Sequence, residues 1–446
     1  MPHVDELIDS RRAWTVAVAG GLANGVAFGT AYTFGAFFEA MADEFHASRG
    51  STALIFGVTL LLFFGFGVVS GPLSDRYSPR SLLLVAGVLF CGGLVATSQV
   101  HHVSLGYLTY GVGVGLGAGF WVTPSFAIVG ALFQRHRALA LGVMATGNGL
   151  GTLILVPVAE GLIEAHGWRS AYLWLAGIGA VAFTLAAIVV VTPPRAPSPP
   201  GRELRGRLMR TANFRALFSS GFLMSVGLFV AFAFLVPFAR DSGVSSAAAA
   251  RLVGLIGLAS IIGRLGTTGL VRRLGPVRLY QLTLALQPVA YLVWLLADGD
   301  VALLVLFVVL LGVAYGGFVA LGPEVAVHLF GVGGIGSVIG LLFLSSGLGG
   351  LVGPPAAGWL SDRSNGRTVP IVAVIVVVVV AAVLASRLRD EQQLTGDDAG
   401  SPRLSRSPNR AGSAAPASAA TGAAWPPVGA RSRRARDGSV GGAEGS

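Results

Sequence analysis

Long apolar runs dominate this chain, and short polar segments rich in glycine, proline and arginine separate them. Strings such as VIVVVVVAAVLA and LLFLSSGLGGLVG offer no polar face to water. Each run is about 20 residues long, the length that an α-helix needs to cross a bilayer core of ~30 Å. The pattern therefore predicts about twelve membrane-spanning helices. We expect them at residues 13–38, 51–71, 81–99, 104–130, 138–162, 169–192, 213–238, 248–270, 277–297, 301–325, 334–357 and 369–387.

The segment TPPRAPSPPGRELRGRLMRTANFR divides the predicted helices into two sets of six, because its proline, glycine and arginine residues cannot cross lipid. The loops GPLSDRYSPRSLLL and TGLVRRLGPVRLY place small, basic and proline residues at matching positions of the two sets. We therefore predict an all-α polytopic membrane protein of two pseudo-symmetric six-helix bundles, a transporter layout with a central site between the bundles. The expected parts are a terminus at 1–12, bundles at 13–192 and 213–387, a loop at 193–212 and a disordered tail at 388–446.

Charge then fixes an expected orientation. Only 12% of the residues are charged, against about 25% in soluble proteins. The net charge of +10 comes from arginines, since the chain has no lysine, and most of them fall in short loops on one side of the predicted helices. Such a bias orients membrane helices, so we expect both termini in the cytoplasm, a location in the inner or plasma membrane, and no nucleic-acid partner. The single cysteine, Cys91, excludes an intrachain disulfide.

The loop after the second predicted helix carries a recognisable motif. Gly71-Pro-Leu-Ser-Asp-Arg-Tyr-Ser-Pro-Arg80 resembles the signature G-x-L-x-D-R-x-G-x-R of the major facilitator superfamily, with Ser78 where glycine is usual. Gly71 would let helices approach closely, and Asp75 could pair with an arginine or cap a facing helix. We expect Gly71, Asp75, Arg76 and Arg80 to control an inner gate. The alternative is a solvated loop that only sets topology.

The matching loop of the second half lacks the acid, since Arg272 stands where Asp75 does, so its gate contact must differ. Three further stretches resemble the monocarboxylate porter branch and its oxalate:formate antiporter relatives. They are FQRHRALALG followed by VMATGNGLG, then EAHGWRSAY, and finally GSVIGLLFLSSGLGGLVGPPAAGWLSDRSN. The resemblance covers residues 13–387 and implies a carrier of small organic anions.

The stretch LASIIGRLGTTGL places Arg264 inside the eighth predicted helix, ~9–12 Å from its inner end. A charge at that depth is costly, so it should face a cavity or a partner. No acid at the same depth is an obvious match, and a guanidinium fork fits a carboxylate with two hydrogen bonds. The resemblance likewise associates the arginine at this position with the substrate carboxylate. The alternative is that Arg264 reaches the interface or makes a structural hydrogen bond.

Two departures from the family bear on coupling. Proton-coupled members carry an acid one turn before this arginine, where Ser260 stands here, and a lysine in the first helix, where Tyr32 is the nearest match. Lactate-type proton symport is therefore in doubt, and anion exchange and uniport are open. Glu160 is a further candidate proton carrier near the outer rim. Tyr32, Asn148, Ser260, Tyr315 and Phe318 are candidate substrate contacts beside Arg264, although helix packing or interhelical hydrogen bonds would explain them too.

The sequence thus predicts a secondary transporter that moves a small mono- or dicarboxylate by alternating access, with a proton or a counter-anion as the candidate coupling ion. It contains no ATP-binding loop, no metal-ligand spacing and no catalytic triad pattern, so we expect neither an enzyme nor a cofactor. The bilayer is its expected partner, and no oligomer is required. Two alternatives are open: an exporter of hydrophobic compounds, and a transporter-like sensor with the tail as its output.

Overall fold

The computed structural model describes residues 7–193, 209–330, 335–364 and 366–389, without the side chains at positions 72, 75, 138, 268 and 335–337. Nearly all of these residues are helical. The N-terminal half comprises α1 (Arg11–Tyr32), α2 (Phe34–Glu44), α3 (Arg49–Gly65), α4 (Gly67–Arg76), α5 (Pro79–Thr97), α6 (Val103–Gly106), the π-helix η2 (Tyr107–Val114), α7 (Gly115–Leu132) and α8 (Arg137–Val189). The C-terminal half comprises α10 (Ala212–Asp241), α11 (Ser246–Leu274), α12 (Pro276–Ala297), α13 (Val301–Phe330), α14 (Ile335–Ser364) and α15 (Thr368–Ala385).

The twelve predicted spans correspond to these helices, with local breaks. The first span is divided at Thr33 and the second at Phe66. Helix α8 contains both the fifth and the sixth span, and the chain turns between them at Gly167, whose φ of +78° favours glycine. Within the described residues, ten helical segments are long and apolar enough to cross a membrane, with α8 counted once. The predicted all-α polytopic fold is confirmed, whereas most of the central loop and the tail from 390 lie outside the described residues.

Polar residues at the ends of the spans explain where several helices begin. The Ser10 hydroxyl accepts a hydrogen bond from the N–H of Ala13 (3.1 Å) at the start of α1. Ser78 does the same for Ser81 (3.1 Å) at the start of α5. Such caps satisfy N–H groups that have no partner within the helix. The helices therefore start at the capping residues, slightly before the apolar runs that marked the spans.

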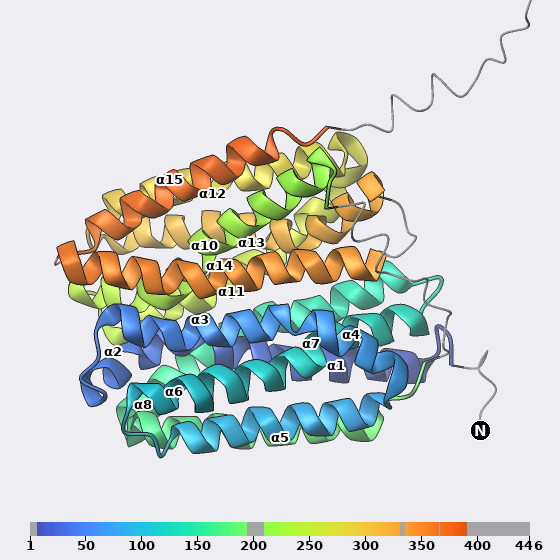
Figure 1. Cartoon of the computed structure of the whole chain (residues 1–446), viewed down its shortest axis with the longest axis horizontal. Coiled ribbons are helices and arrows are strands. Elements are labelled where there is room, and N and C mark those ends of the chain that lie inside the picture. The colour runs from blue at the N-terminus through green and yellow to red at the C-terminus, as the bar shows by residue number, and fades with distance from the viewer. Residues whose placement is uncertain (1–6, 194–208, 331–334, 365, 390–446) are drawn as a thin grey trace, which may run out of the picture. The chain divides into compact units, whose positions relative to one another are not determined.

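Several helix pairs join the two halves. Helix α3 lies against α14 (Figure 1), and α8 against α11, while smaller contacts join α2 to α10 and α4 to α14. The α8–α11 contact depends on small residues, because a Cβ atom at Gly257 would stand only 2.6 Å from the Gly149 carbonyl oxygen. Glycine at both positions lets the two backbones touch. The helices can therefore pack closely at the centre of the interface between the halves.

The alternating glycines of YGVGVGLGAGF face two different neighbours. A Cβ atom at Gly117 would lie 2.5 Å from the backbone nitrogen of Phe90 on α5. One at Gly119 would lie 2.5 Å from the carbonyl oxygen of Leu62 on α3. These glycines therefore let α7 pack closely against both α5 and α3.

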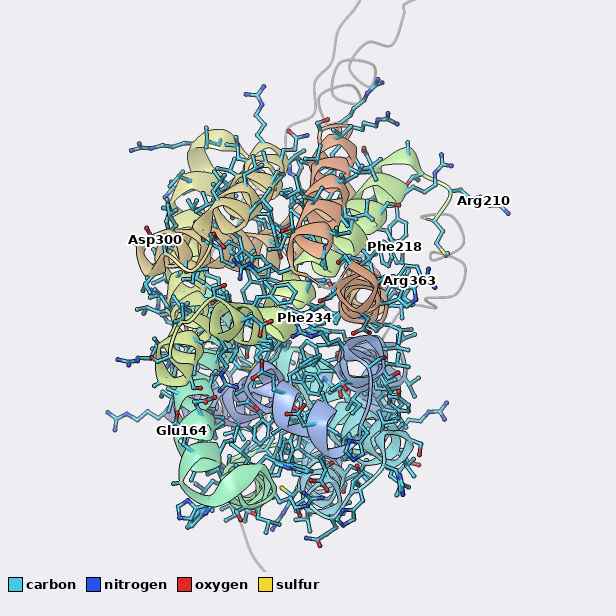
Figure 2. All side chains as sticks on the ribbon, turned by 90° about the vertical axis from the view of Figure 1, so that its left-hand side faces the viewer. Glu164, Arg210, Phe218, Phe234, Asp300 and Arg363 are labelled. Carbon is cyan, nitrogen blue, oxygen red and sulfur yellow. The ribbon has the colours of Figure 1, made fainter. Side chains whose placement is uncertain are left out.

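The helices run alternately between two ends of the bundle. We call the basic end the one at which α1 begins and α4 ends, and the opposite end the one at which α2 ends and α3 begins. Figure 2 views the opposite end, with Glu164, Asp300 and Arg363 labelled. The described arginines in the first or last turns, or in the loops, of the basic end are Arg11, Arg12, Arg76, Arg80, Arg135, Arg137, Arg210, Arg215, Arg272, Arg273, Arg278, Arg387 and Arg389.

Candidate functional site

A cavity lies between the two halves, with an empty volume of about 780 Å³, mouth included. Its walls are mainly aromatic and aliphatic, and they reach from Tyr32 at mid-depth to Leu217 and Ile339 near the basic end. Polar side chains are few and are placed mostly on the wall of the C-terminal half. The lining aromatic residues are Phe28, Tyr32, Phe64, Phe126, Phe229, Tyr280, Tyr315, Phe318 and Phe343.

A pair of tyrosines bridges the halves at the inner wall of the cavity. The hydroxyls of Tyr32 and Tyr315 lie 3.3 Å apart, and either can donate. The Tyr32 ring also stacks on Phe232 with ring centroids 4.0 Å apart. Both tyrosines are buried. This aromatic layer separates the cavity from the opposite end of the bundle.

Arg264 lies beside this layer and is 8% exposed. Its Nη1 donates a hydrogen bond of 2.7 Å to the Ala145 carbonyl of α8, in the other half. The centre of its guanidinium lies 5.6 Å from the centroid of the Tyr315 ring. Arg264 therefore contacts a residue that lines the cavity, although it does not itself line it. Its positive charge thus lies next to Tyr315, just outside the residues that line the cavity.

The structure brings most of the other candidate contacts to the same place, with one exception. Asn148, one turn along α8 from Ala145, lines the cavity, as does Phe318. Ser260 does not line it: its hydroxyl donates to the Gly257 carbonyl (2.7 Å) within α11. Helix α13 covers it, since a Cβ atom at Gly316 would stand 2.1 Å from the Ser260 carbonyl oxygen. The expectation that Ser260 contacts substrate is not supported by this geometry.

Two of the membrane amides make contacts between helices instead of lining the cavity. The Asn24 Nδ2 donates to the Ser125 hydroxyl (3.1 Å). The Gln287 Nε2 donates to the Met224 carbonyl (3.3 Å). Amides inside membrane helices often make such hydrogen bonds between helices, and these contacts account for both residues.

The predicted inner gate lies at the basic end and is only partly described. Arg76 and Arg80 are exposed, and the Asp75 side chain is outside the described set. No described atom lies within 4 Å of where a Cβ atom at Gly71 would stand. Gly71 therefore does not permit a close helix contact in this conformation, contrary to expectation, because α4 has no described neighbour at that point. The gating role of the four residues stays a prediction.

A second copy of the motif spacing, which was not predicted, lies at the opposite end. The stretch GWLSDRSNGR, residues 358–367, repeats G-x-L-S-D-R-x-x-x-R at the end of α14. The Asp362 carboxylate accepts hydrogen bonds from the N–H groups of Arg49 (3.1 Å) and Gly50 (3.1 Å) at the start of α3. An acid of the C-terminal half thus caps a helix of the N-terminal half. The repeated spacing was the signal that could have found it.

Ion pairs at the opposite end also join the halves. Arg49 of α3 pairs with Asp241 of α10 (3.0 Å). Arg240 of α10 pairs with Glu39 of α2 (3.0 Å) and with Glu160 of α8. These pairs could not be predicted from the sequence, because it does not show which loops of the two halves meet. The opposite end is closed in this conformation by charged contacts.

Comparison with known proteins decides the family. The family model described as Major Facilitator Superfamily matches residues 20–300 and 275–430. The chain belongs to the major facilitator superfamily. Among curated relatives, it is 31% identical over 378 residues to Monocarboxylate transporter 3 of Rattus norvegicus, covering 79% of this chain and 75% of that protein. It is 30% identical over 370 residues to Monocarboxylate transporter 11 of Homo sapiens, covering 80% and 78%.

Solved structures of facilitator proteins have the same fold. A bacterial homologue of the human lysosomal transporter Spinster, in an inward-facing and unoccupied conformation, matches with a TM-score of 0.69 at 17% identity and covers 85% of this chain and 98% of that one. The nucleoside transporter NupG matches with a TM-score of 0.70 at 13% identity, covering 85% and 100%. This facilitator chain is therefore a multi-pass membrane transport protein, and the expectation that it is not an enzyme is confirmed.

Proposed function

We propose that this facilitator protein carries a small monocarboxylate across the membrane by alternating access. The observation that carries the proposal is the position of Arg264, which links α11 to the Ala145 carbonyl of α8 and lies against Tyr315 at the polar edge of an apolar cavity. A carboxylate that enters beside Asn148 and Tyr315 would lie close to the guanidinium, because Arg264 contacts the Tyr315 ring and binds Ala145, one turn from Asn148. Arginine suits this role because its planar fork binds carboxylates with two hydrogen bonds.

The cavity walls favour one carboxylate over two. Phe64, Phe318 and Phe343 line the cavity together with aliphatic residues, and none of its described lining residues is basic. A second carboxylate placed against these rings would lose its hydration without gaining a cation, which is costly. The same walls would bury the apolar body of a monocarboxylate favourably, at roughly 25 cal/mol per Å². We therefore infer a substrate with one carboxylate and an aryl or branched alkyl body.

We further propose that the basic end faces the cytoplasm, in keeping with the positive-inside rule. Both termini would then be cytoplasmic, in the inner or plasma membrane. The described conformation would be closed to the outside by the ion pairs of Arg49 and Arg240, with its cavity nearer the inside. The relatives named as monocarboxylate transporters support the substrate class.

Uptake into liposomes tests the proposal. We expect the purified protein to transport 3-phenylpropionate, and to transport its neutral amide and phenylsuccinate, a dicarboxylate, much more slowly. Arg264→Ala should reduce phenylpropionate uptake roughly 30-fold, the effect of losing about 2 kcal/mol from a charge-assisted pair. Arg264→Lys keeps the charge but loses the fork, and we expect an intermediate rate. Arg251→Lys, an exposed position on the same helix, is the matched control and should leave uptake unchanged.

Wild-type rates in both Arg264 variants would overturn the assignment of the carboxylate site. The apolar walls also suit an exporter of hydrophobic compounds, which is the second candidate function. That alternative predicts transport of the neutral amide at least as fast as of the acid, with no dependence on Arg264. A proton or counter-anion requirement for phenylpropionate flux would identify the coupling ion.

A further inference from the structure

Three charged side chains meet at the opposite end, where α2, α8 and α10 converge. Arg240 donates from Nη1 to Glu39 Oε2 (3.0 Å) and from Nη2 to Glu160 Oε1. The Glu160 side chain is 3% exposed, against 34% for Glu39. Arg240 belongs to the C-terminal half and both acids to the N-terminal half. One guanidinium therefore holds two carboxylates across the contact between the halves.

Glu160 is the less satisfied of the two acids. Its second oxygen, Oε2, is buried and has no hydrogen-bond partner among the described residues. The charged groups around it are Arg240 from α10, Glu39 from α2 and Glu164 one turn further along α8. An ionised carboxylate in such a place depends on its cation, because burial and neighbouring acids both disfavour its charge.

Helix α11 also packs on α8, but its described side chains do not supply a second cation to Glu160. Helix α11 carries Arg251 at the opposite end, and its Nε donates to the Ala247 carbonyl of the same helix (3.0 Å). Arg251 is exposed. Among the described side chains, Arg240 is thus the one basic group shown to bind Glu160.

We propose that Glu160 binds a proton and that this proton competes with Arg240 for the carboxylate. While the halves touch at this end, the Arg240 N–H groups occupy the carboxylates. When the halves separate, Arg240 leaves with α10, and Glu39 and Glu160 remain together on the N-terminal half. Two neighbouring carboxylates without a cation take up a proton readily. A proton from solution therefore stabilises the open form, and closure returns it to solution as the guanidinium binds.

Two sets of aromatic side chains separate this proton site from the cavity. Phe38 and Phe234 meet across the halves with ring centroids 5.0 Å apart, and Figure 2 shows Phe234 where the two halves meet. The stacked pair of Tyr32 on α1 and Phe232 on α10 lies deeper in the bundle. Glu160 thus does not contact substrate, and its protonation controls access from this end whatever the substrate is.

Cysteine labelling in nanodiscs tests the proposal without a transport assay. Val236 lies one turn before Arg240 on α10 and is fully buried in the closed form. In a Cys91→Ser background, the reaction of Val236→Cys with a bulky impermeant maleimide reports opening of this end. His102→Cys, at an exposed position of the same end, provides the reference for the intrinsic effect of pH on thiol reactivity.

We expect the labelling ratio of Val236→Cys to His102→Cys to rise about tenfold between about pH 8 and about pH 5 in the otherwise unchanged protein. Adding Glu160→Gln, which carries no titratable proton, should give a high ratio at every pH. Glu164→Gln, an exposed acid one turn away, is the matched control and should keep the pH dependence. A ratio that does not change with pH in the protein with native Glu160 would overturn the proposal, and so would a steep pH dependence that survives Glu160→Gln.

Discussion

The two ends of the bundle use their carboxylates in different ways. At the basic end, Asp9 accepts hydrogen bonds from the N–H groups of Arg135 (2.9 Å) and His136 (3.1 Å), so it ties two segments of the same half together. At the opposite end, Asp362 and Glu160 bind groups that belong to the other half. Asp9 therefore ties segments of one half together at the basic end, whereas Asp362 and Glu160 join the two halves at the opposite end.

This difference indicates which contacts must break during transport. A carrier with a central site has to open its two ends in turn, so contacts between the halves are the ones that change. Contacts within a half, such as those of Asp9, can persist through the cycle. Charged pairs suit the changing contacts because water solvates the separated groups, whereas separated apolar surfaces would gain nothing. The comparison thus predicts large effects for pairs between the halves and small effects for pairs within one.

The largest effect is expected for Arg240→Ala. The substitution leaves the buried Glu160 without its cation, and removing one partner of a buried ion pair typically costs about 3–5 kcal/mol. We expect the free energy of unfolding in detergent at neutral pH to fall by about 3 kcal/mol, at the low end because Glu39 and Arg240 are partly exposed. Chemical denaturation followed by tryptophan fluorescence measures it.

The double variant Arg240→Ala/Glu160→Gln is the informative control, because it removes the stranded charge and should recover most of the lost stability. Arg367→Ala is the matched comparison: its partner Asp298 is 86% exposed, and a surface pair contributes little. Equal losses for Arg240→Ala and Arg367→Ala would show that burial of Glu160 does not set the energy of this end.

A smaller effect is expected for Asp362→Ala, which removes the cap on α3. Losing a capping carboxylate costs about 1 kcal/mol, and the negative charge at a helix N-terminus adds to this. Because the cap joins the halves, we expect the labelling of Val236→Cys to rise severalfold, in addition to a modest drop in melting temperature. Asp362→Asn retains a hydrogen-bond acceptor, so its labelling and melting temperature should fall between those of the wild type and Asp362→Ala. If labelling does not change, the cap stabilises α3 without holding the halves together.

Much of the fold was predictable because the bilayer imposes a simple rule on the chain. The run 369–387 predicted α15 within two residues at each end, since every residue of a spanning helix must satisfy its backbone internally. The break at Thr33 was not predictable, because an apolar run is equally consistent with one helix or two. The end of α14 was predicted too early, at residue 357, because the helix continues through polar residues to Ser364.

The candidate site was predictable where the depth of a residue along its helix is enough to place it at the cavity. Asn148 and Tyr315 lie near the middle of their predicted spans and Tyr32 within two turns of the end of its own, and the structure places all three at one cavity. Ser260 shows the limit, because its depth is right but its side of α11 is covered by α13. Rotation about the helix axis depends on which neighbours pack there, and glycine-rich helices of nearly uniform apolarity have no polar face to reveal it.

Within the cavity, Tyr315→Phe should have a still smaller effect, and on transport alone. The variant removes a cavity-lining hydroxyl that can donate to the substrate carboxylate, and one such hydrogen bond contributes about 1 kcal/mol. The 3.3 Å contact with the Tyr32 hydroxyl is long for a hydrogen bond between hydroxyls, so its loss costs the fold little. We expect a severalfold increase in KM for phenylpropionate and no change in melting temperature. Tyr280→Phe, which lines the same cavity but whose hydroxyl lies 3.5 Å from that of Ser220, is the control. Equal changes in KM for both variants would place the carboxylate elsewhere.

The smallest effect is expected for Glu44→Gln, which tests the contrast itself. Glu44 is at the opposite end, but its partners Arg169 (2.9 Å) and His101 (3.3 Å) belong to the same half. The Arg169 guanidinium lowers the pKa of Glu44, so the carboxylate stabilises the fold above its ordinary pKa, and this contribution is lost as the pH falls through the lowered value. We expect a slight loss of melting temperature at neutral pH that disappears in acid, and no change in Val236→Cys labelling. Increased labelling would mean that total charge at this end, and not pairing between the halves, controls its opening.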